Sequence, residues 1–230
     1  MPPTQSVLLS GGSGALGASV LRRLQRAEFA VHAPASSPKS IAELMQAGAR
    51  ATQVDLTDEA AVKAYVNSLP ANGDLRAAVL LAGGFAMGSL AETSSTDLRK
   101  MLAINFETAF HLVRELLPIL ERRGGGQFVL VGARPALNAD AGAHMAAYAL
   151  SKGLVHQLAE LINAHGRGKH IDATVIVPSV IDTPANRAAM PDADPGKWVS
   201  PDAIAETIAF VLSDAGRQMR GSVLKLYGES

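Results

Sequence analysis

Short apolar runs alternate with amphipathic stretches along nearly the whole chain, and this alternation is the feature that most restricts the fold. Residues 6–10, 77–81 and 171–177 are apolar on successive positions, which is typical of strands buried on both faces. Further strands are predicted at 29–35, 51–54, 127–131 and 222–226, and helices at 15–27, 41–47, 58–69, 95–123, 146–162 and 201–212. We therefore expect an α/β fold with a single Rossmann-like, doubly wound parallel sheet of about seven strands and helices on both faces.

Bulk composition narrows the function classes. The 230 residues are 48% hydrophobic, which suits one sizeable core, so residues 1–230 are expected to form a single domain. Lysine plus arginine equals aspartate plus glutamate at 21 each, which argues against nucleic acid or an anionic membrane as partner. The start MPPTQS lacks the features of a secretory signal, and no apolar run approaches the ~18–20 residues of a membrane span. The expected protein is cytoplasmic and acts on a small molecule.

Metal and disulfide chemistry are not expected. The chain has no cysteine, which excludes disulfides and thiolate ligands. None of its six histidines has the paired helical spacing of a metal site, so no metal is predicted.

A glycine-rich segment, SGGSGALG at residues 10–17, lies between the first predicted strand and the first predicted helix. Glycines permit a tight turn and a close approach of the backbone to a ligand. The helix that follows would direct its free N–H groups and positive dipole end at a pyrophosphate. The segment therefore indicates a dinucleotide-binding loop.

Tyr148 and Lys152 stand four residues apart on a predicted helix, so the phenol and the ammonium share one face. A free tyrosine has a pKa near ~10, too high for fast proton exchange at neutral pH. A nearby cation favours the phenolate and would lower that pKa by about 2 units or more. The pair is the predicted proton donor of an enzyme.

These motifs, in this order, resemble those of the short-chain dehydrogenases/reductases. The glycine loop is similar to the family's TGxxxGxG, with Ser10 for Thr and Ala15 for the middle glycine. YxxxK is present at 148–152, and Asn105 resembles the asparagine that bends the family's long helix and supports a relay water near the lysine. The resemblance implies catalytic roles for Tyr148, Lys152 and Asn105. It implies cofactor contacts for Gly11, Ser13, Ala15, Leu16, Gly17, Ser36, Asp55, Leu56, Ala82, Gly83, Gly84, Tyr148, Lys152, Pro178, Val180, Ile181 and Thr183.

Within the family, the chain is most similar to the dihydropteridine reductase branch. The segments AGGFAMG (82–88), YALSKGLVHQL (148–158) and DTPANRAAMPDAD (182–194) carry this resemblance. The family's usual serine, about thirteen residues before the tyrosine, is missing: Pro135 stands there, and matching the strand end gives Gly132 or Ala133. A plain ketone needs that polarising hydroxyl more than a conjugated, already electrophilic acceptor does.

The residue after the second strand is expected to select the cofactor, because an acid there binds the ribose 2′-hydroxyl and repels a 2′-phosphate. The position falls near Ala35 or Ser36, and no acid is present. Ser36, Ser37 and Lys39 offer donors to a phosphate. NADP (NADPH) is therefore favoured, with NAD left open.

Five side chains are candidates for substrate contact: Arg134, Asn138, His144, Met190 and Trp198. The last two lie in the irregular segment at about 182–200, which resembles the family's substrate lid. Leu154, Leu158 and Leu161 are either core or part of a subunit interface. The resemblance implies a homodimer or homotetramer, since family members usually pair through their two long helices.

Three functions remain open. The favoured one is NAD(P)H-dependent reduction of a quinonoid dihydropterin or a similar conjugated acceptor. The second is reduction of a ketone, quinone or acyl-derived substrate by the same site. The third is a non-catalytic, NADP-binding sensor or scaffold.

Overall fold

The computed structural model describes residues 5–70 and 75–229 and contains one seven-stranded sheet with all pairs parallel. The strand order is β3-β2-β1-β4-β5-β6-β7. The strands are β1 (Gln5–Ser10), β2 (Phe29–Ala35), β3 (Arg50–Gln53), β4 (Leu75–Leu80), β5 (Gly126–Val131), β6 (Ile171–Pro178) and β7 (Val223–Leu226). The predicted doubly wound parallel sheet is confirmed.

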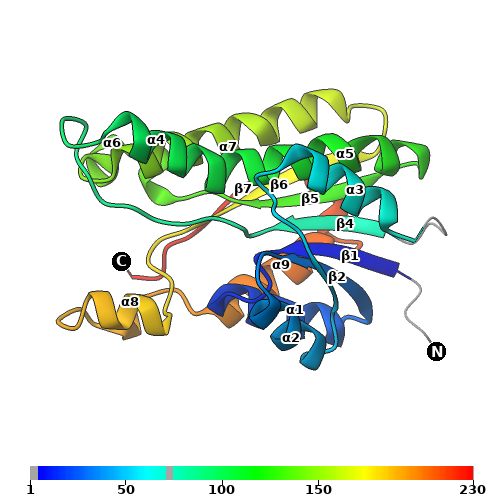
Figure 1. Ribbon diagram of the computed structural model, residues 1–230, viewed down its shortest axis with the longest axis horizontal. Helices are drawn as coiled ribbons and strands as arrows, with labels where there is room; N and C mark the ends of the chain where they lie inside the picture. Colours follow the sequence, from blue (N-terminus) through cyan, green and yellow to red (C-terminus); the bar gives the residue numbers. More distant parts are fainter. Residues whose placement is uncertain (1–4, 71–74, 230) are drawn as a thin grey trace.

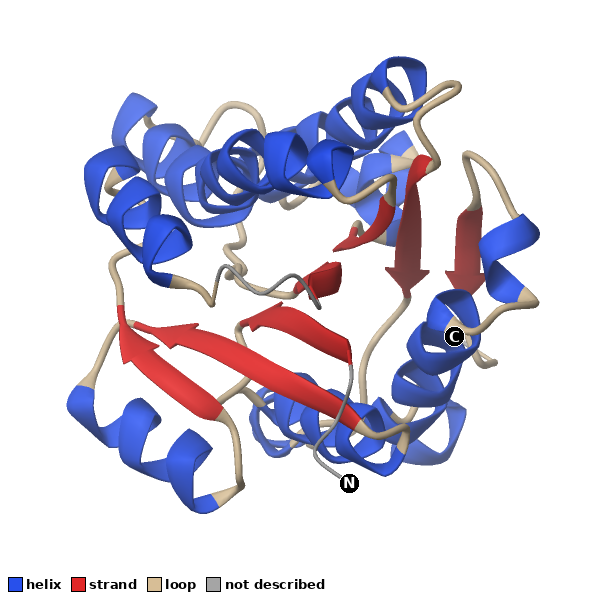
Figure 2. Ribbon diagram, turned by 90° about the vertical axis from the view of Figure 1, so that its right-hand side faces the viewer, coloured by secondary structure: helices blue, strands red, loops and turns tan. Residues whose placement is uncertain are grey.

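Helices cover both faces of the sheet, giving three layers (Figures 1 and 2). One face carries α1 (Ala15–Arg26), α2 (Pro38–Gln46) and α9 (Pro201–Leu212). The other carries α3 (Glu59–Ser68), α4 (Ser95–Leu102), α5 (Thr108–Arg122) and α7 (Ala146–His165). Two short helices, α6 (Ala139–Gly142) and α8 (Pro184–Ala189), lie near the carboxyl end of the sheet. Within the described residues, no helix is long and apolar enough to cross a bilayer.

Two hydrophobic clusters separate the layers, and strand β1 shows how the sequence divides between them. Val7 and Leu9 pack on the side of α1 and α9, whereas Leu8 packs on the side of α5 and α7. Successive side chains of a strand point to opposite faces. Both faces are buried, which explains why the predicted strands are apolar without alternation.

The long helix predicted at 95–123 is interrupted. The segment Ala103–Glu107 between α4 and α5 is a π-helical turn, and Asn105 lies within it. A proline inside a predicted helix favours a kink, but α5 runs through Pro118 and the interruption lies at the π turn instead. A π turn widens the hydrogen-bond ladder by one residue and often accompanies a functional site.

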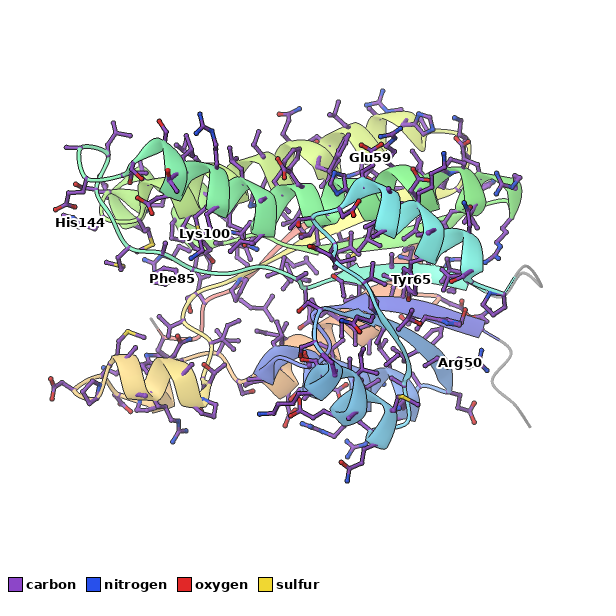
Figure 3. The ribbon with its side chains drawn as sticks, viewed as in Figure 1. Arg50, Glu59, Tyr65, Phe85, Lys100 and His144 are labelled. Atoms are coloured by element: carbon purple, nitrogen blue, oxygen red, sulfur yellow. The ribbon has the colours of Figure 1, made fainter. Side chains whose placement is uncertain are left out.

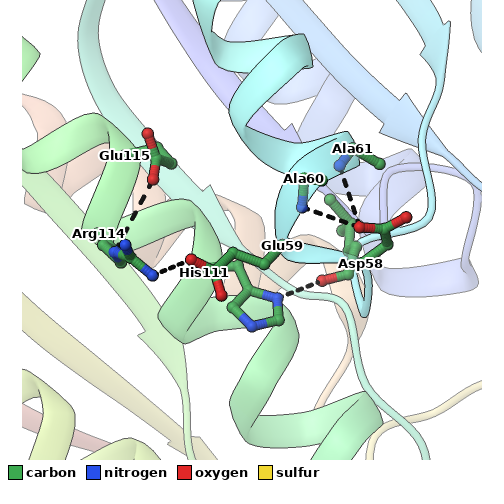
Figure 4. Close-up of polar contacts among 8 residues, drawn as sticks. Asp58, Glu59, Ala60, Ala61, His111, Arg114 and Glu115 are labelled. Atoms are coloured by element: carbon green, nitrogen blue, oxygen red, sulfur yellow. Dashed lines mark hydrogen bonds and ion pairs between the residues drawn. The ribbon is translucent and has the colours of Figure 1, made fainter.

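Polar contacts fix the loop after β3 against α5 (Figure 4). Asp58 caps α3 by accepting from the backbone N–H groups of Ala60 and Ala61 at 2.8 and 3.2 Å. Glu59 forms an ion pair with Arg114, and His111 Nδ1 lies 3.1 Å from the carbonyl oxygen of Leu56. These contacts anchor the loop that carries Asp55 and Leu56, two of the predicted cofactor residues, to α5.

Candidate functional site

Most of the residues predicted to bind a cofactor line one groove of about 860 Å³ at the carboxyl edge of the sheet. The groove opens where β1 lies between β2 and β4, which is the point at which the strand order reverses. Ligands of open α/β sheets bind at such a switch point. The predicted residues in its lining are Gly11, Ser13, Ala15, Leu16, Gly17, Ser36, Asp55, Leu56, Ala82, Gly83, Ile181 and Thr183.

Close packing of backbone explains the glycines at the two ends of the loop. Gly11 has a φ of +69°, and a Cβ there would lie 2.8 Å from the backbone nitrogen of Ala82. A Cβ on Gly17 would lie 2.1 Å from the carbonyl oxygen of Gly11. The loop therefore folds tightly onto both the start of α1 and the end of β4.

The amino end of α1 has no side-chain cap, unlike those of α2, α4 and α9. Its N-cap residue is Gly14, no side chain bonds its first N–H groups in the described part of the chain, and its first turn holds no acid. By contrast, Ser37, Ser94 and Ser200 cap α2, α4 and α9. An uncapped, positively polarised helix end facing a groove fits an anionic ligand such as a pyrophosphate.

The far end of the groove has the features expected around an adenosine. Asp55 is exposed and accepts from the backbone N–H and hydroxyl of Thr57 at 2.9 and 2.7 Å. These hydrogen bonds, the hydroxyl's first, hold the pKa of Asp55 below its ordinary value. Ser36 is exposed just after β2, and Ser37 uses its hydroxyl to cap α2. Lys39 lies 4.0 Å from Glu43 on the same helix.

The three predicted catalytic residues lie together beyond Gly83. Asn105 is buried, accepts from the Gly84 backbone N–H at 2.8 Å and donates to Ser151 Oγ at 3.0 Å. Ser151 in turn donates to the carbonyl oxygen of Tyr148 at 2.8 Å. Asn105 thus connects the loop after β4 to the start of α7.

Gly83 stands at the junction of the groove and this cluster. A Cβ on Gly83 would lie 2.5 Å from Asn105 Oδ1 and 3.4 Å from Lys152 Nζ. Only a residue without a side chain fits there while Asn105 keeps its place. Glycine at position 83 therefore has a steric reason.

Burial governs both titratable groups of the pair. Lys152 is 6% exposed, its Nζ donates to the carbonyl oxygen of Val131 at 2.8 Å, and burial lowers its pKa to about 8. Burial raises the pKa of Tyr148 to about 12. The sequence predicts a lowered tyrosine pKa, whereas burial in the structure raises it. The Lys152 ammonium donates to the carbonyl oxygen of Val131 instead of to the phenol, and desolvation disfavours the phenolate of Tyr148.

No side-chain hydroxyl follows β5 before Tyr148. Residues 132–147 contain neither serine nor threonine. This stretch forms a 3₁₀ turn at Arg134–Ala136 and the short helix α6 before α7 begins. The segment between β5 and α7 thus contains short helical turns.

Phe85 lies against the tyrosine, which the sequence patterns do not predict. Its ring centroid is 5.1 Å from that of Tyr148, edge to face, and the side chain is 59% exposed. It sits on the loop between β4 and α4 (Figure 3). The one sequence signal for the position of Phe85 is an aromatic residue that directly follows two glycines.

The five substrate candidates are dispersed. The Arg134 guanidinium lies 5.2 Å from the Tyr227 ring centroid, and Asn138 caps α6. His144 is exposed at the tip of the molecule, and its carbonyl oxygen accepts from Gly88 at 2.8 Å (Figure 3). Met190 ends α8 half-buried, whereas Trp198 is 9% exposed and offers little ring surface for stacking.

The predicted lid at 182–200 is more ordered than its sequence indicates. It contains α8 and a 3₁₀ turn at Pro195–Lys197, and Ile181 pairs with Val199 in an isolated bridge. Pro178 and Val180 are outside the groove lining, and the Thr183 hydroxyl caps α8 by accepting from Asn186 at 3.2 Å. Within the described ranges, no group of three His, Asp or Glu side chains gathers as a metal site.

Comparison with known proteins identifies the class. The family model described as short chain dehydrogenase matches residues 5–194. The chain belongs to this family, the short-chain dehydrogenases/reductases, and it is an NAD(P)-dependent oxidoreductase.

The individual relatives differ in activity. A dihydropteridine reductase of Dictyostelium discoideum is 27% identical, over 99% of this chain and 96% of its own. The cyclic-di-GMP-binding biofilm dispersal mediator protein of Escherichia coli is 29% identical, over 83% and 78%. A short-chain oxidoreductase of Pseudomonas aeruginosa, solved with NADPH and having an atypical catalytic centre, superposes with a TM-score of 0.86 at 22% identity, over 97% and 95%. These identities do not single out one substrate.

Proposed function

We propose that the protein reduces a planar, conjugated acceptor of the quinonoid dihydropterin kind, with NADPH as the preferred reductant and Tyr148 as the proton donor. The observation that carries this proposal is the pairing of Phe85 with Tyr148 in a site that has no hydroxyl after β5. The exposed ring offers a stacking surface beside the phenol. The missing hydroxyl removes the group that polarises a plain ketone.

The magnitudes favour an activated acceptor. Loss of one oxyanion donor typically costs about 10²-fold or more in rate. An acceptor that is already electrophilic avoids most of that cost, because it requires mainly hydride delivery and one proton. An aromatic pair adds roughly 0.5–1.5 kcal/mol beyond the area it buries, which favours a flat substrate over an aliphatic one.

The groove fits a dinucleotide, which supplies the hydride when bound. The uncapped end of α1 and the backbone of Gly11 and Gly17 would hold the pyrophosphate. Ser36 and the amino end of α2 supply donors and no carboxylate at the ribose end. That environment supports NADPH over NADH.

Each catalytic side chain has a separate task in this proposal. The Tyr148 hydroxyl donates a proton to the reduced acceptor. From its place at the end of β5, Lys152 provides a positive charge that would oppose the raised pKa of the phenol and would hold the nicotinamide ribose. Asn105 positions both by joining Gly84 to the start of α7.

The same proposal includes a homo-oligomer. Helices α5 and α7 leave Phe110, Leu150, Leu154 and Leu161 exposed, whereas Leu158 on α7 is core. These two long helices are the ones expected to pair with a second copy. Exposed apolar side chains on both of these helices support such an interface.

An acceptor panel tests the proposed reaction. NADPH and NADH oxidation would be measured with quinonoid dihydropterin, a quinone, a plain ketone and an acyl-derived ketone. We expect the conjugated acceptors to have the higher kcat/KM, and Phe85→Ala to raise their KM roughly 3- to 10-fold. Met87→Ala, on the same exposed loop, is the matched control. A clear preference for the plain ketone would refute the proposal, and cofactor binding without any turnover would favour a sensor.

A further inference from the structure

A histidine that none of these steps uses lies directly behind Lys152. His156 follows Lys152 by four residues on α7, so both side chains leave the same face of the helix. Lys152 Nζ donates to the Val131 carbonyl, and His156 Nε2 lies against the next residue, Gly132. The two groups therefore meet consecutive residues at the end of β5.

Gly132 makes room for the imidazole. A Cβ on Gly132 would lie 2.5 Å from His156 Nε2 and 2.9 Å from Val175 Cγ1. Gly132 is not among the glycines with positive φ, so its backbone conformation does not require glycine. The neighbouring imidazole is therefore the steric reason for glycine at this position.

The imidazole nitrogen at this contact is buried and unsatisfied. His156 Nε2 has no hydrogen-bond partner among the described residues. Folded proteins rarely leave a buried polar atom unpaired, and those that persist call for a functional or structural explanation. A leucine would fill the same space without that cost.

The charge of the neighbouring Lys152 offers an explanation for the unpaired imidazole nitrogen. Burial lowers the pKa of His156, the Lys152 ammonium lowers it further, and Glu160 opposes them. The two charged groups that shift it, Lys152 and Glu160, are both on α7, and Gly132, which lies against the ring at the end of β5, is uncharged. At neutral pH the pair holds one positive charge, on Lys152.

We propose that His156 is a positioning residue for Lys152: its neutral imidazole fills the space beside Gly132 and keeps the ammonium at the end of β5, and only one of the two side chains carries a charge. Protonation of His156 places a second cation beside Lys152 and displaces it. Both the affinity for NADPH and the turnover rate therefore fall at low pH, because both depend on Lys152. The catalytic use of Lys152 rests on the proposed function, whereas the coupling of the two charges does not.

Titration of the histidine rings by NMR in the full chain without cofactor tests the coupling independently of turnover. We expect Lys152→Met to raise the pKa of His156 by about 0.5–1 unit, because a neighbouring positive charge is removed. Lys169→Met is the control, since Lys169 Nζ lies 3.1 Å from His165 Nε2 and its loss should alter only that ring. An unchanged His156 titration in Lys152→Met overturns the proposal, whatever the enzyme reduces.

The pH dependence of NADPH affinity tests the consequence for the site. His156→Gln keeps a polar side chain that does not titrate, so its dissociation constant should stay flat where the wild-type value rises at least threefold between pH 7 and about 5. Gly132→Ala should displace the ring and weaken binding at all pH values. In the double variant Gly132→Ala, His156→Ala the ring is absent, so any stability that Gly132→Ala loses through its contact with the ring should be recovered. If the NADPH dissociation constant of His156→Gln rises between pH 7 and about 5 as much as that of the wild type, the proposal is contradicted.

Discussion

At the scale of single residues, burial shifts the pKa values of both Tyr148 and Lys152 away from their charged forms. Lys152 is a buried cation with a pKa of about 8, and burial raises the pKa of Tyr148 to about 12. Both shifts oppose the charged forms that proton transfer needs. The buried Lys152 ammonium therefore costs stability, and a bound dinucleotide and acceptor would have to offset the raised pKa of Tyr148.

Replacing the lysine should expose this cost. The pKa of Lys152 lies below its ordinary value of 10.5, so the unfolded chain binds the proton more tightly. The penalty is present in full below about pH 8 and disappears as the pH rises toward 10.5. Lys152→Met should raise the free energy of unfolding by about 1–3 kcal/mol at pH 7 and abolish turnover.

Urea unfolding at pH 7 and 9.5 measures this difference. The advantage of Lys152→Met over the wild type should shrink at the higher pH, while Lys169→Met, on an exposed lysine, should show no such trend. A variant that is less stable than the wild type at pH 7 would show that the ammonium is well solvated or well paired.

Cofactor choice also belongs to this scale. Ser36 lines the groove just after β2, where an acid would repel a 2′-phosphate. Ser36→Asp should shift the ratio of kcat/KM for NADPH over NADH at least tenfold toward NADH. Ser95→Asp, which adds the same charge at the exposed start of α4 and outside the groove lining, is the control. An unchanged ratio would place the 2′-phosphate elsewhere.

At the scale of elements, the strand–loop–helix unit at the start of the chain sets the groove. Gly17→Ala should abolish dinucleotide binding, because its Cβ would lie 2.1 Å from the Gly11 carbonyl oxygen. Gly14→Ala is the matched control, since its Cβ would lie 3.5 Å from that same oxygen. Fluorescence titration with NADPH compares them, and equal affinities would refute this account of the loop.

Periodicity made the regular elements predictable. The strands are apolar on both faces, and the glycine loop follows the first of them, so the sheet and the groove could be expected from the sequence. The π turn at Asn105 could not, because a helical pattern of 95–123 contains no sign of one extra residue in the ladder. The helices in 134–142 and 184–189 are too short for periodicity to indicate.

Contacts between distant residues account for the rest. Phe85 contacts Tyr148, and His156 lies against Gly132, although the partners are far apart in the sequence and no spacing pattern links them. Trp198 was a candidate for stacking on substrate, yet it is nearly buried because the lid has structure of its own. Such placements depend on tertiary packing, which a single sequence does not encode locally.

At the scale of the whole molecule, the exposed apolar side chains of α5 and α7 predict self-association. Leu154→Glu should convert the assembly to a smaller species, because a charge at an apolar interface is not compensated. Leu90→Glu is the control, since Leu90 is more exposed but lies on the loop between β4 and α4. Light scattering at micromolar concentrations measures both, and a monomeric wild type would contradict the predicted oligomer.

The central claim is that Tyr148 delivers a proton to an acceptor that is already activated. The most direct measurement is NADPH oxidation with quinonoid dihydropterin by the wild type and by Tyr148→Phe, with NADPH affinity measured in parallel. General acid catalysis typically contributes about 10²–10⁴-fold. The account predicts that the rate falls by about 10²-fold or more, while NADPH affinity changes by a much smaller factor. Equal rates in the two proteins would contradict it.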